Sequence, residues 1–560
     1  ALADQDIAWF LLSPAGLVAL ILLAGLGIAI LGFEQASLMT MSAGHAPGLH
    51  IGTVAALRYT AARSYGIFLF AIRLVMRVLM LTLPFLAIAG AIAWYLLTDY
   101  DINYYLAEQP REFWVASVLI GGLLLVMTVL LVNKLLGWSL ALPLVLLADY
   151  SPAQSFSESV RITSGNRVIL LRILAIWAAL SLLLGGLVAG IVGLLGSQLV
   201  PRFYDSIEWL VPVLGGVVAL WMLGNFLVTV FTSGGLAYVL VEFFERHAAK
   251  QGRIDLTSMA RPPTTRGWRL SAPLLAIALA VAAASAILVG HWLMNGIHIR
   301  DTVTIVAHRG AAGKAPENTL ASMRMAIEDG TDWLEIDVQE SADGEVMVIH
   351  DSDFMKLSNV NMKVWDGSFA EIRDIDVGGW FDPQFSAERV PTLAEVLELA
   401  RGKAHVVIEL KYYGHDQQLE QRVIDIVERL DMVNEVAIMS LKYEGIQKVR
   451  ALRPDWTIGL LSATAIGNLA KLDVDFLAVA TGLATPGFVR RSQEQGKQVF
   501  VWTVNDSVSM SRMMSLGVDG IITDEPALAR EVIHERADLN PAERLIMHTA
   551  VLFGRPEPPR

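Results

Sequence analysis

The sequence predicts two domains of different fold class, an α-helical multispan membrane domain followed by an α/β barrel of the (β/α)₈ TIM type. Three observations support this prediction. Apolar runs long enough to cross a bilayer dominate residues 1–296. From residue 303 onward, short apolar strands alternate with helical patterns. Finally, 54% of the 560 residues are hydrophobic and only 18% are charged, which is too apolar for a purely soluble chain of this length.

Composition excludes several classes of function. The formal net charge of −12 argues against a nucleic-acid partner, because nucleic acids bind basic surfaces. The chain has no cysteine, so disulfides, zinc–thiolate sites and cysteine nucleophiles are excluded. No cleavable signal peptide is evident, because Asp4 and Asp6 stand where its basic region would lie.

We expect about six membrane-spanning helices in the first domain, since roughly 20 apolar residues cross a bilayer as a helix. They are placed near residues 9–32, 76–98, 114–134, 168–197, 209–240 and 272–295. A further apolar run at 135–150 is interrupted by Pro143. This run could extend the third span, re-enter the membrane or lie in its interface.

Basic residues are distributed unequally between the connecting segments. Segments with at least four Lys or Arg residues are 33–77, 134–172 and 241–271. By contrast, the segments 99–113 and 198–208 carry one Arg each. Basic loops stay in the cytoplasm, so the second domain is predicted to be extracytoplasmic. Six spans would also put residue 1 outside, and we therefore expect a further helix before Ala1.

The second domain contains nine candidate strands. They are 303–307, 333–338, 345–349, 405–410, 435–440, 457–461, 475–480, 498–504 and 520–523. A (β/α)₈ barrel needs eight, so one of them lies outside the barrel. The link from Asp337 to Glu345 is too short for a helical crossover, so we expect an irregularity there. A helix is predicted to begin at Asn318, capped in the usual way.

Polar residues gather at the carboxyl ends of several predicted strands, where barrels of this type form their active sites. They are His308, Arg309, Glu335, Asp337, His350, Asp351, Glu409 and Lys411. Glu335 and Asp337 are two residues apart on one strand, so their side chains share a face. One such residue alone would usually be a structural ion-pair partner, but this grouping predicts a site.

The three carboxylates Glu335, Asp337 and Glu409 would repel one another in a partly dry barrel mouth. A divalent cation removes this repulsion, and all-oxygen ligands suit Ca²⁺ or Mg²⁺ better than zinc. Arg309 and Lys411 add positive charge, which suits an anionic substrate such as a phosphate.

Two histidines on different strands, His308 and His350, can serve as general base and general acid. Together with the predicted cation, they indicate metal-assisted cleavage of a phosphodiester.

Eight motifs make the prediction more specific. In chain order they are HRG at 308–310, PENT at 316–319, EIDV at 335–338, DGEVMVIHD at 343–351, PTLAEVLEL at 391–399, IELK at 408–411, VWTVN at 501–505 and GVDGIITDEP at 517–526. Together they resemble the glycerophosphodiester phosphodiesterase family over 303–533, which implies a barrel of the phospholipase-C-like phosphodiesterase type. The preceding half resembles the membrane domain fused to some bacterial members.

The resemblance implies a role for each matching residue. His308 and His350 would form the acid–base pair, and Glu335, Asp337 and Glu409 would hold Ca²⁺ or Mg²⁺. The remaining implied roles are a phosphate clamp at Arg309, a contact of Lys411 with the phosphoryl oxygens, support of the site by Glu317 through orienting a histidine, and a pocket wall at Trp502.

Family chemistry implies that the glycerol 2-hydroxyl attacks phosphorus, releases the alcohol and forms a cyclic phosphate. Water then opens this phosphate to glycerol 3-phosphate. The implied organisation is a membrane domain at 1–296, a phosphodiesterase barrel at 297–540 and a C-terminal tail at 541–560. The implied location is the bacterial inner membrane, with the barrel outside and membrane lipids as partners.

Two alternative functions remain open. One has a different substrate, and the other makes the chain a different class of protein. The barrel could act on lysolipid, as a lysophospholipase D or a related lipid phosphodiesterase does. Alternatively, the membrane half could be a lipid-handling or transport module with an accessory barrel. Trp365, Trp380, Phe381 and Phe385 lie in the insert after His350, and they could form a core or an apolar lip facing lipid.

Overall fold

The computed structural model describes residues 2–3, 13–43, 50–203, 207–248, 303–537 and a few positions between 260 and 288. The chain divides into two compact units. One unit comprises residues 10–95 and 115–291 and holds the long helices. The other comprises residues 1–9, 96–114 and 292–560 and holds the barrel.

Five helices among the described residues are long and apolar enough to cross a membrane. They are α2 (Pro14–Ala43), α4 (Ser64–Leu97), α6 (Arg111–Trp138), α9 (Arg167–Leu199) and α10 (Ile207–His247). At most 22% of the most apolar stretch of each helix is buried, so most of its apolar surface faces outward, as lipid requires. The sixth predicted span, 272–295, lies mostly outside the described residues.

Several of these helices extend beyond the predicted apolar windows. The helix α4 begins at Ser64, twelve residues before the predicted span at 76–98, and includes Arg73 and Arg77. Helical hydrogen bonding continues beyond the apolar run, so hydropathy marks only the part of the helix suited to lipid.

The apolar run at 135–150 forms a separate short helix. The helix α6 ends at Trp138, and α7 (Ala141–Leu147) follows with all seven residues buried. Pro143 lies in the first turn of α7, where a helix needs no backbone donor. The hydroxyl of Ser159 in α8 (Gln154–Thr163) donates to the carbonyl oxygen of Gly137 at 2.6 Å, which links α8 to the end of α6.

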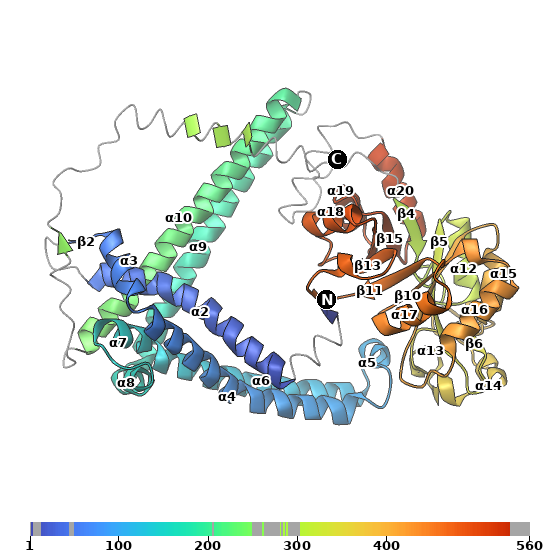
Figure 1. Cartoon of the computed structure of the whole chain (residues 1–560), viewed down its shortest axis with the longest axis horizontal. Coiled ribbons are helices and arrows are strands. Elements are labelled where there is room, and N and C mark those ends of the chain that lie inside the picture. The colour runs from blue at the N-terminus through green and yellow to red at the C-terminus, as the bar shows by residue number, and fades with distance from the viewer. Residues whose placement is uncertain are drawn as a thin grey trace. The chain divides into compact units, whose positions relative to one another are not determined.

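Eight parallel strands close the predicted barrel (Figure 1). They are β4 (Thr304–Ala307), β5 (Trp333–Glu340), β9 (His405–Leu410), β10 (Val436–Ser440), β11 (Ile458–Ser462), β13 (Phe476–Ala480), β14 (Gln498–Trp502) and β15 (Gly520–Thr523). Pairing of β4 with both β15 and β5 completes the ring. The extra strand is β6 (Val346–Val348), which pairs antiparallel with β5 across the short link.

Helices cover the outside of the barrel. They are α12 (Leu320–Glu328), α15 (Leu393–Ala400), α16 (Leu419–Arg429), α17 (Tyr443–Leu452), α18 (Pro486–Glu494), α19 (Ser507–Ser515) and α20 (Pro526–Ala537). A large apolar core fills the space between these helices and the strands, and a smaller cluster fills the barrel interior. Inside, Gly459 leaves room for the ring of Phe476, which a Cβ at this position would meet at 2.2 Å.

The insert after β6 has a small core of its own. The insert contains β7 (Asp353–Phe354), α13 (Met355–Ser358), β8 (Val360–Lys363) and α14 (Phe369–Arg373). None of the four aromatic residues predicted as core or lip belongs to this core. Trp380 is 43% exposed and makes an edge contact with Phe381, whereas Trp365 stacks on His415 at 4.2 Å. The exposure of Trp380 favours the lip at that position, whereas the other three rings are half-buried.

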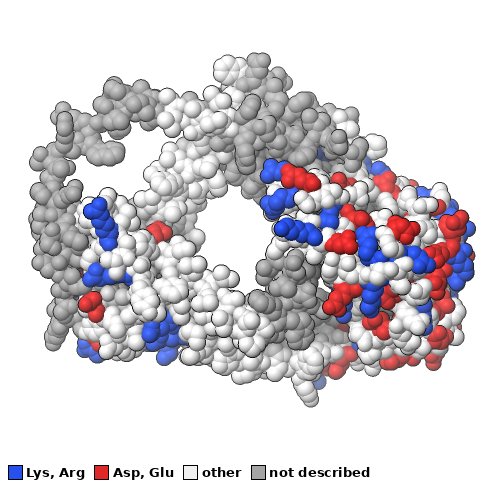
Figure 2. Space-filling view, viewed as in Figure 1, with Lys and Arg blue, Asp and Glu red and all other residues white. Residues whose placement is uncertain are grey.

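Two short segments from the N-terminal half belong to the barrel's unit. The strand β1 (Leu2–Ala3) pairs antiparallel with β12 (Ala465–Ile466). The helix α5 (Ile102–Glu108) lies in the segment 96–114, between α4 and α6. Charged residues are dense over the barrel and sparse over the long helices (Figure 2).

Candidate active site

The loop after β4 turns sharply and carries the first predicted residues. Arg309 and Gly310 both have positive φ, 52° and 83°. A Cβ on Gly310 would lie 2.7 Å from the backbone carbon of Ser322, so only glycine fits this close approach. The turn directs the backbone N–H of Arg309 to the Glu335 carboxylate at 2.9 Å.

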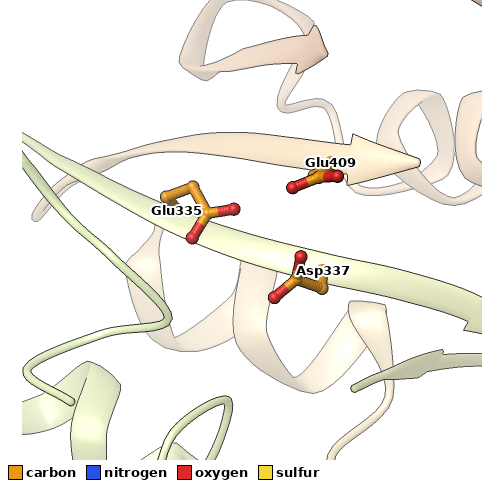
Figure 3. Close-up of side chains that lie close together, drawn as sticks. All are labelled: Glu335, Asp337 and Glu409. Carbon is orange, nitrogen blue, oxygen red and sulfur yellow. The ribbon is translucent and has the colours of Figure 1, made fainter. Parts of the chain in front are cut away.

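The three predicted metal ligands lie together. Glu335 and Asp337 project from β5, and Glu409 projects from β9, where it is the register partner of Asp337. The side chains point toward one another (Figure 3). One oxygen from each carboxylate lies within 4.8 Å of the others, and all three residues are at most 5% exposed.

Their electrostatics fit a bound cation. Burial raises the pKa of Glu335, and the charges of Asp337 and Glu409 raise it further. Burial also raises the pKa of Glu409, although Lys411 opposes the shift. Asp337 Oδ1 is buried and accepts no hydrogen bond within the described residues. Ca²⁺ or Mg²⁺ would bind to such hard oxygen ligands, offset their mutual repulsion and occupy an oxygen that accepts no hydrogen bond.

Two cationic side chains flank the carboxylates. Lys411 Nζ lies 3.0 Å from Glu409 Oε1 and 3.5 Å from Asp337 Oδ1. Burial lowers the pKa of Lys411, but the two carboxylates outweigh burial and raise it to about 12. Arg309 Nε lies 3.3 Å from Asp337 Oδ2, so both cations remain charged beside the cluster.

Glu317 accepts hydrogen bonds from Arg309 and Lys356, and no histidine among the described residues bonds to it. Arg309 Nη1 donates to Glu317 Oε1 at 2.8 Å, and Lys356 Nζ donates to Oε2 at 2.6 Å. Burial opposes ionisation of Glu317, but the two cations outweigh burial and lower its pKa to about 2. The resemblance implied that Glu317 orients a histidine, whereas its hydrogen bonds in the structure are to the arginine and the lysine.

Asn318 does not begin the following helix as predicted. The N-cap of α12 is Thr319, which forms a capping box with Ser322. Asn318 has a φ of 56°, and its amide donates to Asp337 Oδ2 at 2.9 Å. The side chain of Asn318 thus bonds to the carboxylate cluster, and the next residue caps the helix.

Each histidine is bonded through Nδ1 to a carboxylate. His308 Nδ1 lies 2.7 Å from Asp524 Oδ1, and His350 Nδ1 lies 2.6 Å from Asp351 Oδ1. Their side chains are 20% and 17% exposed, so substrate can reach them. A carboxylate on Nδ1 fixes the ring and its tautomer and leaves Nε2 as the nitrogen that could exchange a proton.

Sequence reasoning identified Asp351 but missed three other residues that contact the site, Asp524, Asn505 and Lys356. Asp524 comes directly after the predicted strand at 520–523, so its position carried the same signal as the residues that were identified. Asn505, which donates to Asp524 Oδ2, lies just beyond the predicted strand at 498–504 and inside a quoted motif. Lys356 lies in the insert, where no pattern distinguished it.

Trp502 is at the carboxyl end of β14, partly buried, and its indole N–H donates to the carbonyl oxygen of Ala478 at 3.0 Å. Its role as a pocket wall stays a prediction. A cavity of about 330 Å³ lies at the opposite end of the barrel, lined by residues such as Trp333, His405 and Gln498 at the amino ends of strands. It contains none of the predicted site residues.

The chain resembles known proteins over both halves. The model of the glycerophosphoryl diester phosphodiesterase family matches residues 308–528. The model of the membrane domain of glycerophosphoryl diester phosphodiesterase matches residues 1–282. Both halves of the chain therefore match models of one enzyme family.

Relatives match the barrel. The glycerophosphodiester phosphodiesterase of Caldanaerobacter subterraneus subsp. tengcongensis is 34% identical over 232 residues, which are 40% of this chain and 94% of the relative. That of Bacillus subtilis (strain 168) is 30% identical over 254 residues, 41% of this chain and 87% of the relative. A phosphodiesterase structure from Oleispira antarctica, in complex with the product sn-glycerol-3-phosphate, is 26% identical, with 41% of this chain and 96% of that chain covered and a TM-score of 0.39.

The membrane-domain model matches half of the chain, and the barrel covers nearly the full length of its relatives. The similarity therefore includes both halves of the chain. With its apolar helices before a barrel that carries an acidic cluster and two histidines, the chain belongs to the glycerophosphoryl diester phosphodiesterase family and is a membrane-domain-bearing phosphoric diester hydrolase.

Proposed function

We propose that the mouth of the barrel hydrolyses glycerophosphodiesters to glycerol 3-phosphate and an alcohol by acid–base catalysis assisted by a divalent cation. The observation that supports this proposal most strongly is the buried carboxylate cluster of Glu335, Asp337 and Glu409, with ligand oxygens within 4.8 Å of one another. Relatives at 30% and 34% identity are named glycerophosphodiester phosphodiesterases, which does not favour the lysolipid alternative.

The cluster would hold Ca²⁺ or Mg²⁺, since both prefer oxygen ligands. A bound cation of this kind would offset the charge of the substrate phosphate and make its phosphorus easier to attack. Arg309 and Lys411 would bind the phosphate oxygens, each kept charged by neighbouring carboxylates. Glu317 would hold the guanidinium of Arg309 in place.

His308 and His350 would move the protons. One imidazole accepts the proton of the glycerol 2-hydroxyl as that oxygen bonds to phosphorus. The other donates a proton to the leaving alcohol as its bond to phosphorus breaks. In the second half, water attacks the cyclic phosphate and the ring oxygen regains a proton, so the roles reverse and glycerol 3-phosphate leaves.

A substrate comparison tests this proposal. Full-length protein in detergent with Ca²⁺ or Mg²⁺ should release choline from glycerophosphocholine much faster than from lysophosphatidylcholine. The reverse preference would overturn the substrate assignment in favour of the lysolipid alternative.

We propose further that the barrel lies outside the cytoplasm, with extracytoplasmic glycerophosphodiesters as substrates. Two observations support this orientation. The basic segments lie at the opposite ends of the spans from the segment 99–113, which carries one Arg. In addition, residues 96–114 belong to the same compact unit as the barrel, so both are expected on one side of the membrane.

Protease accessibility tests the orientation. Protease added to intact spheroplasts should remove the barrel, and a reporter that functions only outside the cytoplasm should be active when fused after Arg560. A protected barrel would reverse the orientation and make the substrate pool cytoplasmic.

A further inference from the structure

The segment between α4 and α6 is bound to the barrel by buried polar contacts. Asp101 caps α5, where its carboxylate accepts from the backbone N–H of Asn103 at 3.0 Å. The backbone N–H of Asp101 donates to Asp353 Oδ2 at 2.9 Å, and Asp101 Oδ2 accepts from the backbone N–H of Ser352 at 3.2 Å. Asp101 is 9% exposed and Asp353 is fully buried, so these bonds are shielded from water.

The next contact reaches the catalytic histidine. Asn103 Nδ2 donates to Asp351 Oδ1 at 2.8 Å, and the same oxygen lies 2.6 Å from His350 Nδ1. Asp351 is 1% exposed, and its other oxygen, Oδ2, has no hydrogen-bond partner within the described residues. The two donors on Oδ1 therefore determine the rotation of this carboxylate.

The position of Asn103 is itself fixed. Its Nδ2 also donates to Asp101 Oδ1 at 2.9 Å, so the amide bridges the helix cap and Asp351. On the other side of His350, the hydroxyl of Tyr413 donates to the backbone carbonyl oxygen of His350 at 2.9 Å. Ring and backbone of His350 are thus both held by neighbours.

We propose that Asn103 is a positioning residue for the proposed hydrolysis. By fixing Asp351, it keeps His350 in the orientation that presents Nε2 to the substrate. This inference rests on the proposed function of His350, and it adds a residue from the N-terminal half of the chain to a site otherwise built by the barrel. The segment between two spans is then part of the catalytic apparatus.

Kinetics of the full-length protein on glycerophosphocholine test the inference. Asn103→Ala should lower kcat by about tenfold and leave KM within about twofold, because the lost bond orients a histidine and does not bind substrate. Asn103→Asp should lower kcat further, since it places a carboxylate against Asp351. Asn103→Gln, which keeps the amide donor, should retain more activity than Asn103→Ala. Glu108→Gln, at an exposed position of the same helix, should match the wild type.

A double-mutant cycle separates positioning from docking. If Asn103 acts through Asp351, the effect of Asn103→Ala should nearly vanish in an Asp351→Asn background and persist in an Asp524→Asn background. Equal effects in both backgrounds, or an unchanged kcat in the single variant, would overturn the inference. Wild-type protein that is inactive on glycerophosphocholine would instead contradict the proposed function, so the two failures are distinguishable.

Discussion

The two histidines of the site have the same kinds of partner, a carboxylate that also accepts from an asparagine amide, but these partners come from different parts of the chain. On one side, His308 is bonded to Asp524, which accepts from Asn505, and all three residues belong to the barrel. On the other side, His350 and its carboxylate belong to the barrel, whereas the amide comes from Asn103 on α5. The barrel thus supplies both partners on the side of His308, whereas one partner on the side of His350 comes from a preceding segment.

The largest effect should come from removing the cation, because this affects the steps of both histidines. In the proposed mechanism the cation held by the carboxylate cluster offsets the charge of the phosphate on which both histidines act, so exhaustive chelation with EDTA should abolish turnover. Ca²⁺ or Mg²⁺ should restore it, and Glu335→Gln should raise the cation concentration needed for half-maximal activity. Full activity after chelation would contradict the assignment of a cation to the cluster.

Removing either histidine is the next largest change. His308→Ala and His350→Ala should each lower kcat by roughly 10²–10⁴-fold, the usual contribution of a general acid or base. Thermal unfolding of both variants should stay close to that of the wild type, because both rings are partly exposed. Near-wild-type turnover in one variant would remove that histidine from the pair.

Asp524→Asn and Asp351→Asn compare the two sides directly. Each removes the charge that fixes an imidazole, and we expect each to lower kcat by about 10- to 100-fold. If both histidines take part, the two losses should be of similar size. A loss confined to one variant would show that the resemblance between the two sides is structural and not catalytic.

The smallest effect concerns stability and pH. The pKa of Glu317 is lowered from 4.5 to about 2, so its ion pairs stabilise the fold above about pH 4.5 and are lost as the pH falls through about 2. Glu317→Gln should therefore unfold at a lower temperature than the wild type at pH 6, and this difference should shrink toward pH 3. A difference that does not change with pH would mean that these ion pairs do not contribute to stability.

Much of the barrel could be predicted because its determinants are local. Short apolar runs located all eight barrel strands, and β9 and β15 have the predicted bounds. The excess strand was expected but not identified, because Val346–Val348 has the same apolar pattern as a barrel strand. Only its short link to β5 marked it as the antiparallel one.

Parts of the site could be predicted for the same reason. Glu335 and Asp337 share a face because alternate residues of a strand do. The position of Glu409 beside them could be predicted because the carboxyl ends of barrel strands meet at one end of the barrel. Asn103 could not be predicted, because it is 248 residues from Asp351 and lies in a segment that connects two spans. The reach of Glu317 to Arg309 depends on the turn at Gly310 and likewise has no periodic signal.

One measurement tests the central claim, that the barrel mouth cleaves glycerophosphodiesters by attack of the glycerol 2-hydroxyl. Phosphorus NMR can follow full-length protein and Ca²⁺ or Mg²⁺ with glycerophosphocholine and, in parallel, with its analogue lacking the 2-hydroxyl. The account predicts that glycerophosphocholine is converted to glycerol 3-phosphate while the analogue remains intact. Cleavage of both diesters at similar rates, or of neither, would contradict it.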